Sequence, residues 1–199
     1  MNESKRSFIA SLEQNSPIVQ TELLRKNGLT SREIKVLADA NVMRRLRQGY
    51  YVFASREAEI GDLPLIAALV PMGVFCLQTA IAYHELATVN PAEINVALPR
   101  IANEPTLPEH LNARYFHMTD SHYQLGVSAV MIDGCPVKLY DAEKTVCDCF
   151  KYDREVEKSV ALEALKNYVA RHRNIQKLMD YAKRMGKRNT IQPYLETML

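Results

Sequence analysis

Arginine side chains concentrate in a short segment near the N-terminus, where they could hold a polyanion. Arg44, Arg45 and Arg47 stand within four residues and are followed by Gln48-Gly49, a turn sequence. Guanidinium groups bind phosphate oxygens and reach into the grooves of DNA. If the segment forms a strand, in which side chains alternate between the two faces, Arg45 and Arg47 share one face. The pattern predicts a hairpin that contacts nucleic acid.

A second polar group, made of Ser31, Arg32 and Lys35, stands at the start of a predicted helix. Arginine can read guanine edges, and a helix N-terminus favours a phosphate. A solvated helix face explains these residues equally well, and the neighbouring arginine-rich hairpin favours DNA. The candidate DNA-binding residues are Ser31, Arg32, Lys35, Arg44, Arg45, Arg47 and Gln48.

Patterns typical of enzymes are weak. Glu33-Ile34-Lys35 matches half of a metal-dependent nuclease motif but lies in a predicted helix instead of a strand. His117, Asp120 and His122 could hold a metal, although a surface loop explains their spacing. No phosphate-binding glycine loop is present. We therefore expect no catalytic residues, metal or cofactor. The four cysteines (Cys76, Cys135, Cys147 and Cys149) are expected to be buried free thiols.

The elements expected within residues 1–56 would bring the basic side chains together. Apolar spacing predicts helices near 7–12, 21–26 and 31–40, a short extended step at Ile18-Val19, and a hairpin over 42–53. Thr30 and Glu33 form a capping box for the third helix. This order predicts a winged helix-turn-helix.

The remainder, residues 60–199, is expected to form a mixed α/β domain. Strands are predicted between about 94 and 140, with a hairpin turn at Asp133-Gly134, and helices between 141 and 198. Asp141, Asp153 and Asn174 are candidate helix caps. The predicted fold class is α+β, with an N-terminal winged helix-turn-helix and a C-terminal domain that ends in helices.

Charge is unevenly distributed along the 199 residues, whose net charge is +2. Residues 1–54 hold nine basic and five acidic side chains, and the rest hold 16 basic and 18 acidic ones. A basic head on a slightly acidic body suits a DNA-binding module joined to a domain with another task. No apolar run reaches the ~18 residues of a membrane span. The expected location is the cytoplasm, without a membrane partner.

In the second half of the chain, the segment 77–86, LQTAIAYHEL, is similar to the "SALAYHGL"-type helix of the AbiEi-like antitoxin family. The run 137–150, VKLYDAEKTVCDCF, resembles its "Y-x-x-E-K-T-hydrophobic-x-D" signature, onto which Lys144, Thr145 and Asp148 map. Segments 163–168 and 178–182 match its C-terminal helices, so the resemblance covers nearly the whole chain.

The resemblance implies an antitoxin of a type IV toxin–antitoxin system, linked to abortive phage infection. It implies that the N-terminal domain binds inverted repeats in double-stranded promoter DNA and represses its own operon. The functional partner would be a nucleotidyltransferase-type toxin, countered without a stable complex. Lys144 and Asp148 are expected to form an ordinary i,i+4 pair and not a catalytic site.

The C-terminal helices carry a second basic patch, which could contact DNA or a partner or simply be solvated: Arg171, Arg173, Lys177, Lys183, Arg184, Lys187 and Arg188. Two other functions stay open. One is a ligand-responsive transcriptional regulator, and the other is a nucleic-acid-processing enzyme.

Overall fold

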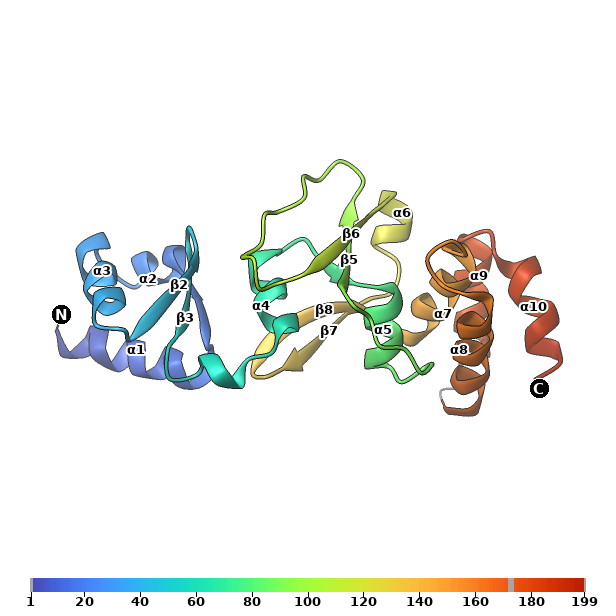
Figure 1. The fold of residues 1–199 in the computed structure, drawn as a ribbon, viewed down its shortest axis with the longest axis horizontal. Helices are drawn as coiled ribbons and strands as arrows, with labels where there is room; N and C mark the ends of the chain where they lie inside the picture. Colours follow the sequence, from blue (N-terminus) through green and yellow to red (C-terminus); the bar gives the residue numbers. More distant parts are fainter. Residues whose placement is uncertain (1, 172–173, 199) are drawn as a thin grey trace. The chain divides into compact units, whose positions relative to one another are not determined.

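The protein is an α+β chain whose structure, a computed structural model, describes residues 2–171 and 174–198. Those residues form ten α-helices and two sheets (Figure 1). By their contacts they divide into two units. The first contains residues 1–71 with segments 105–111 and 130–137, and the second contains 72–104, 112–129 and 138–199. Two segments from the later part of the chain therefore join the N-terminal unit, which the sequence does not indicate.

The first unit is built around three helices and a three-stranded sheet. Its elements in order are α1 (Glu3–Asn15), β1 (Ile18–Gln20), α2 (Thr21–Lys26), α3 (Ser31–Asp39), β2 (Met43–Arg47), β3 (Tyr50–Phe53), the 3-10 turn Glu57–Glu59 and α4 (Asp62–Leu69). The sheet order is β1-β3-β2, with both pairs antiparallel. Apolar side chains from all three helices and the sheet close one core, which includes Ile9, Leu24, Ile34 and Phe53. The short extended step predicted at Ile18-Val19 is confirmed as β1.

A bulge in the β2–β3 hairpin corrects the predicted placement of its arginines. Arg45 pairs with Tyr51, but Arg47 pairs with Tyr50, so β2 carries one extra residue in between. Because side chains alternate along a strand, the extra residue shifts the alternation. Arg45 is exposed and Arg47 is partly buried. The expectation that they share a face was wrong.

The second sheet has the order β6-β5-β4-β8-β7. Its strands are β4 (Val74–Phe75), β5 (Ile94–Pro99), β6 (Ala113–Met118), β7 (Val127–Ile132) and β8 (Cys135–Tyr140). β5 runs parallel to β6, while β4 is antiparallel to β5 and parallel to β8. The turn predicted at Asp133-Gly134 is confirmed, with positive φ at both residues. The two-residue strand β4 was missed because it is too short to show a period.

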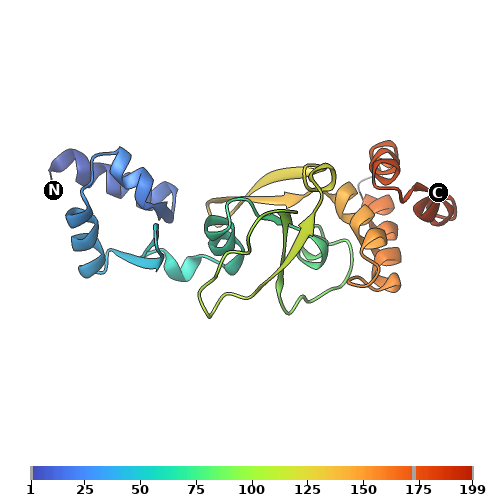
Figure 2. The ribbon, with the colours of Figure 1, turned by 90° about the horizontal axis from the view of Figure 1, so that it is seen from above.

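Helices occupy the C-terminal third, as predicted. They are α7 (Ala142–Lys151), α8 (Lys158–Arg171), α9 (Ile175–Arg184) and α10 (Arg188–Glu196); α5 (Leu77–Tyr83) and α6 (Asp120–Tyr123) come earlier. Figure 2 shows the orange-to-red helices gathered at one end of the sheet. Asp141 and Asn174 cap α7 and α9 as expected, whereas α8 begins five residues after Asp153, which is not its cap. None of the helices in the described ranges combines the length and apolar character that crossing a bilayer requires.

Helix α7 is the centre of the second unit's core, and it corrects a second expectation. Every residue from Ala142 to Phe150 is buried. Lys144 Nζ lies 2.5 and 2.6 Å from the Asp148 carboxylate oxygens, and both side chains are 0% exposed. The ammonium group also lies 4.2 Å from the centre of the Tyr140 ring. The pair is therefore not the solvated helix-surface pair that its spacing suggests.

A glycine fixes the approach of the chain to this ion pair. Gly126 has φ +72, and its carbonyl accepts from the Asp141 amide at 2.8 Å. A β-carbon there would lie 2.6 Å from Lys144 Cβ and 2.8 Å from Asp141 Oδ1. No side chain other than hydrogen fits at this position.

Gly126→Ala is expected to lower the free energy of unfolding by more than about 2 kcal/mol, since left-handed strain alone costs about 1–2 kcal/mol and the overlap adds to it. The matched control is Gly134→Ala, where φ is +74 but nothing lies within 4 Å of the added carbon. Urea unfolding of the two variants separates strain from overlap. Equal losses would show that the close approach to α7 does not matter.

Candidate nucleic-acid interface

Helix α3 is held at its start by a capping box, as the sequence predicts. The Glu33 amide donates to Thr30 Oγ1 at 3.2 Å, and the Thr30 amide donates to Glu33 Oε2 at 2.8 Å. Lys5 from α1 donates to both Glu33 oxygens at 3.0 and 2.9 Å. The bond from the Thr30 backbone, followed by that from Lys5, lowers the pKa of Glu33 to about 2. Glu33 is thus fully used in fixing α3 against α1, which leaves no support for the nuclease reading of Glu33 and Lys35.

The outward face of α3 presents the predicted polar side chains. Ile34 and Leu37 point into the core, while Ser31, Arg32 and Lys35 are exposed. Ser31 Oγ accepts a hydrogen bond from Arg25 Nη2 at 3.1 Å, so the end of α2 joins this face. Gly28, with φ +82, provides the turn between the two helices. Arg25 is not among the residues predicted from the sequence. It lies in the last turn of α2, where a basic side chain stabilises the C-terminal end of a helix.

Arg25 also connects α3 to the hairpin. It shares a surface hollow of about 560 Å³ with Arg45, Gln48 and Gly49 of the β2–β3 hairpin and with the first turn of α2. Within residues 2–171 and 174–198, no ion pair to a carboxylate is formed by Arg25, Arg32, Lys35 or Arg45. Of these four cations, Arg25 and Arg45 line the hollow, together with Glu22, which pairs with Lys26. Cations that are spread over two helices and a hairpin suit a long polyanion. We call Arg25, Ser31, Arg32, Lys35, Arg45 and Gln48 the basic face.

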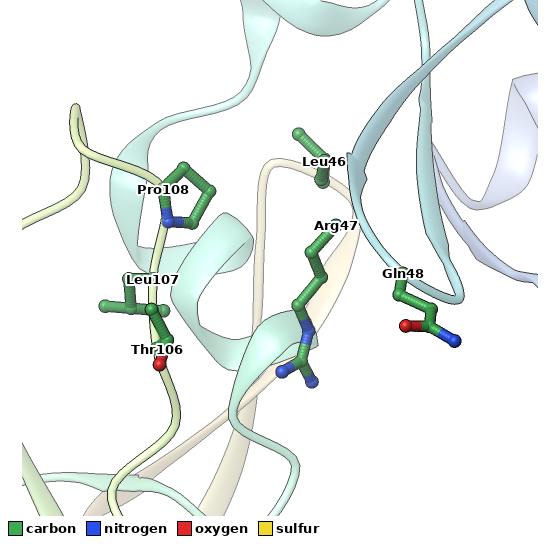
Figure 3. A pocket seen from close by; sticks show the side chains of 6 residues that line it. All are labelled: Leu46, Arg47, Gln48, Thr106, Leu107 and Pro108. Atoms are coloured by element: carbon green, nitrogen blue, oxygen red, sulfur yellow. The ribbon is translucent and has the colours of Figure 1, made fainter.

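Two of the predicted arginines are engaged elsewhere. Arg44 pairs with Glu57, and its Nε donates to that carboxylate at 2.8 Å. Arg47 Nη2 donates to the Leu69 carbonyl at 2.7 Å, and its guanidinium lies 4.6 Å from the centre of the Tyr50 ring. Figure 3 shows Arg47 between Gln48 and Thr106, beside a hollow of about 640 Å³ that Leu46, Leu107 and Pro108 also line. Arg45, by contrast, forms no ion pair among the described residues, and its Nε donates to the Arg47 carbonyl at 3.4 Å.

The second basic patch is divided. Arg171 pairs with Glu85, and Lys177 pairs with Asp141 and Glu143. Arg173 lies outside the described residues. Lys183, Arg184, Lys187 and Arg188 gather where α9 ends and α10 begins, and none of them forms an ion pair among the described residues. Among the described residues of this patch, these four are the cations without an ion pair.

Lys177 belongs to a structural network at the start of α7. Burial raises the pKa of Glu143, but hydrogen bonds from Lys177, its own amide and Tyr168 outweigh burial and lower the pKa. Lys177 Nζ lies 2.9 Å from Glu143 and 3.0 Å from Asp141. Burial lowers the pKa of Lys177, and these two carboxylates outweigh that effect and raise it. These groups compensate one another, and none is placed to accept a substrate proton.

The remaining candidates for chemistry are accounted for individually. His117 Nε2 lies 3.0 Å from the Ala102 carbonyl. Asp120 and His122 belong to the short helix α6. In the part of the chain that the structure describes, no group of three or more His, Cys, Asp or Glu side chains is arranged to hold a metal. The four cysteines are buried and free of disulfides. The basic face is therefore the surface with the clearest chemical preference, which is for anions.

Comparison with known proteins bears on the fold. No protein-family model and no curated protein sequence matches the chain. Among solved structures, the chain is similar to the RV2827C protein from Mycobacterium tuberculosis, with a TM-score of 0.57 and 12% sequence identity. The match covers 98% of this chain and 82% of that one. At this identity the similarity concerns the arrangement of the elements alone, and it extends over both units.

Proposed function

We propose that the first unit contains a winged helix-turn-helix that binds double-stranded DNA and that the protein represses transcription. The observation that carries the proposal is the basic face, whose Arg25, Arg32, Lys35 and Arg45 form no ion pair among the described residues. In such modules the second helix enters the major groove and its N-terminal residues reach the bases. Here α3 takes that role, and Arg45 with Gln48 reaches the flanking phosphates. The Thr30 cap and the Lys5–Glu33 bond to α1 hold α3 rigid.

We propose further that the chain is the antitoxin of a type IV system and represses its own operon. This part rests on the resemblance of segments 77–86 and 137–150 to AbiEi-like antitoxins. The partner would be a nucleotidyltransferase-type toxin. The cations at the α9–α10 junction, of which Lys183, Arg184 and Arg188 are exposed and Lys187 is partly buried, are candidates for a second contact with DNA or with that partner.

A variant that separates the two tasks tests the proposal. The double variant Arg32→Ala/Arg45→Ala is expected to lose repression of a reporter driven by the chain's own upstream region. It is expected to keep protecting cells from the toxin encoded beside it, because the changes lie outside the second unit. Unchanged repression would refute the DNA-binding half. If wild-type chain gives no protection, or the adjacent gene encodes no nucleotidyltransferase, the antitoxin half fails.

A ligand-responsive regulator is the second candidate, favoured by one hollow in the first unit. It measures about 260 Å³ and is lined by Ile18 and Tyr50 of the sheet, by Pro64 and Ala67 of α4, and by Cys135 among others. Its lining is mostly apolar, as in small-molecule sites. Tyr50 follows the turn of the β2–β3 hairpin, so a ligand there would contact the DNA-binding element directly. A ligand that changes operator affinity when added to the purified protein would favour this candidate.

A further inference from the structure

One apolar side chain interrupts the polar outward face of α3. Val36 is 58% exposed, although the helix buries Ile34 and Leu37 beside it. Four residues turn a helix by about 40° beyond one full turn. Val36 therefore lies next to Arg32 on the same face, one turn further along. An isolated exposed valine is ordinary, but this one lies beside Arg32, at the edge of the basic face.

Val36 lies at a hollow in the protein surface that has both a charged and an apolar side. Arg32, Glu33, Val36 and Leu37 line a hollow of about 250 Å³. The Glu33 carboxylate is turned to Thr30 and Lys5, and Leu37 is 8% exposed. The hollow thus presents to a ligand the Arg32 guanidinium group beside the apolar side chains of Val36 and Leu37. Because cations lie nearby, an apolar protein surface would fit this hollow poorly. A polyanion that carries an apolar group would fit it well.

We propose that Val36 contacts the C5 methyl group of a thymine in the major groove, close to the base that Arg32 reads. The inference rests on the proposed DNA binding and deepens it. In the major groove thymine is the base that carries a methyl group, and small apolar side chains recognise it. Val36 lies about 6 Å beyond Arg32 along the helix axis. With base pairs about 3.4 Å apart, the thymine lies within two base pairs of the position read by Arg32.

The test uses full-length protein and duplexes that it enriches from a random-sequence library. Each thymine of the enriched site is replaced in turn by deoxyuridine, which removes only the methyl group. Wild-type protein is expected to lose about four-fold in affinity at one position, the effect of one buried methyl. Val36→Ala is expected to bind thymine and deoxyuridine duplexes equally at that position. Val127→Ala, which trims another exposed valine, is the matched control and should discriminate as wild type does.

The outcomes separate the inference from the function on which it rests. If wild type shows no thymine preference, or Val36→Ala keeps it, the methyl contact is refuted while DNA binding stands. If no duplex is enriched at all, DNA binding and the methyl contact fall together. An unchanged melting temperature for Val36→Ala excludes unfolding as the cause of any lost discrimination. If Val36→Ala alone abolishes the thymine preference, Val36 is a specificity residue.

Discussion

Replacing Arg32 and Arg45 with alanine is expected to weaken the binding of duplex DNA by at least about 30-fold, because each arginine in such an interface contributes about 1–3 kcal/mol. Arg32 projects from α3 and Arg45 from β2, and neither forms an ion pair among the described residues. Losing the phosphate-directed charge of Arg45 should also reduce the slope of log affinity against log salt by about 1. Fluorescence anisotropy across a salt series measures both quantities.

The matched control is Arg44→Ala, on the same strand as Arg45. Its guanidinium is already paired with Glu57, and an exposed pair of this kind contributes little to stability. Its loss should change affinity less than about three-fold, as for a charge already neutralised by its partner. A loss as large as that of Arg45→Ala would mean that the ion pair opens on DNA and that the arginines act together. Unchanged affinity in the double variant would place the DNA elsewhere.

Lys144→Met is expected to lower the free energy of unfolding by about 3–5 kcal/mol, because it leaves the Asp148 carboxylate buried without a partner. Both side chains are 0% exposed, and Lys144 Nζ contacts both carboxylate oxygens. Methionine has a similar length and fills the space without a charge. Urea unfolding at pH 7 measures the loss. Lys166→Met, at an exposed position of α8, is the control and should change stability by less than about 0.5 kcal/mol.

The loss in free energy of unfolding that Lys144→Met causes is expected to become smaller as the pH falls. Burial already raises the pKa of Asp148, and Lys144 opposes that rise. Without Lys144 the pKa in the folded protein rises further above its value in the unfolded chain. The variant therefore keeps its full stability below the pKa of about 4 that Asp148 has in the unfolded chain. It loses stability as the pH rises through the higher pKa that Asp148 has in the folded protein. A deficit that does not change with pH would show that lost packing, and not an unpaired carboxylate, is the cause.

A double variant separates charge from packing. Lys144→Met/Asp148→Leu removes both charges and should recover most of the loss, since apolar residues often replace a buried pair without cost. If the double variant recovers its stability but no longer protects cells from the toxin, the pair is needed for the proposed antitoxin activity. If it is less stable than either single variant, apolar packing cannot replace the pair at this position.

The boundaries of many elements can be read from the sequence because their causes are local. Thr30 and Glu33 determine where α3 begins, and the capping box they form spans four residues. Asp133-Gly134 similarly makes the β7–β8 turn, and Asp141 caps α7. The start of α8 was misplaced because Asp153 is only one of several residues able to cap a helix. The strand β4 has two residues, too few for any periodic signal.

By itself, the sequence determined a basic N-terminal segment, the helix–turn–helix–hairpin order, and Arg32 and Arg45 as candidates. Only the tertiary structure decided which charges are available. Arg47 bonds to Leu69, 22 residues away, and Lys5 bonds to Glu33, 28 residues away. The bulge after Arg45 and the complete burial of Lys144 with Asp148 are likewise settled by packing. The reason is physical: periodicity and capping depend on neighbours within a few residues, whereas burial and ion pairing depend on segments that meet only when the chain folds.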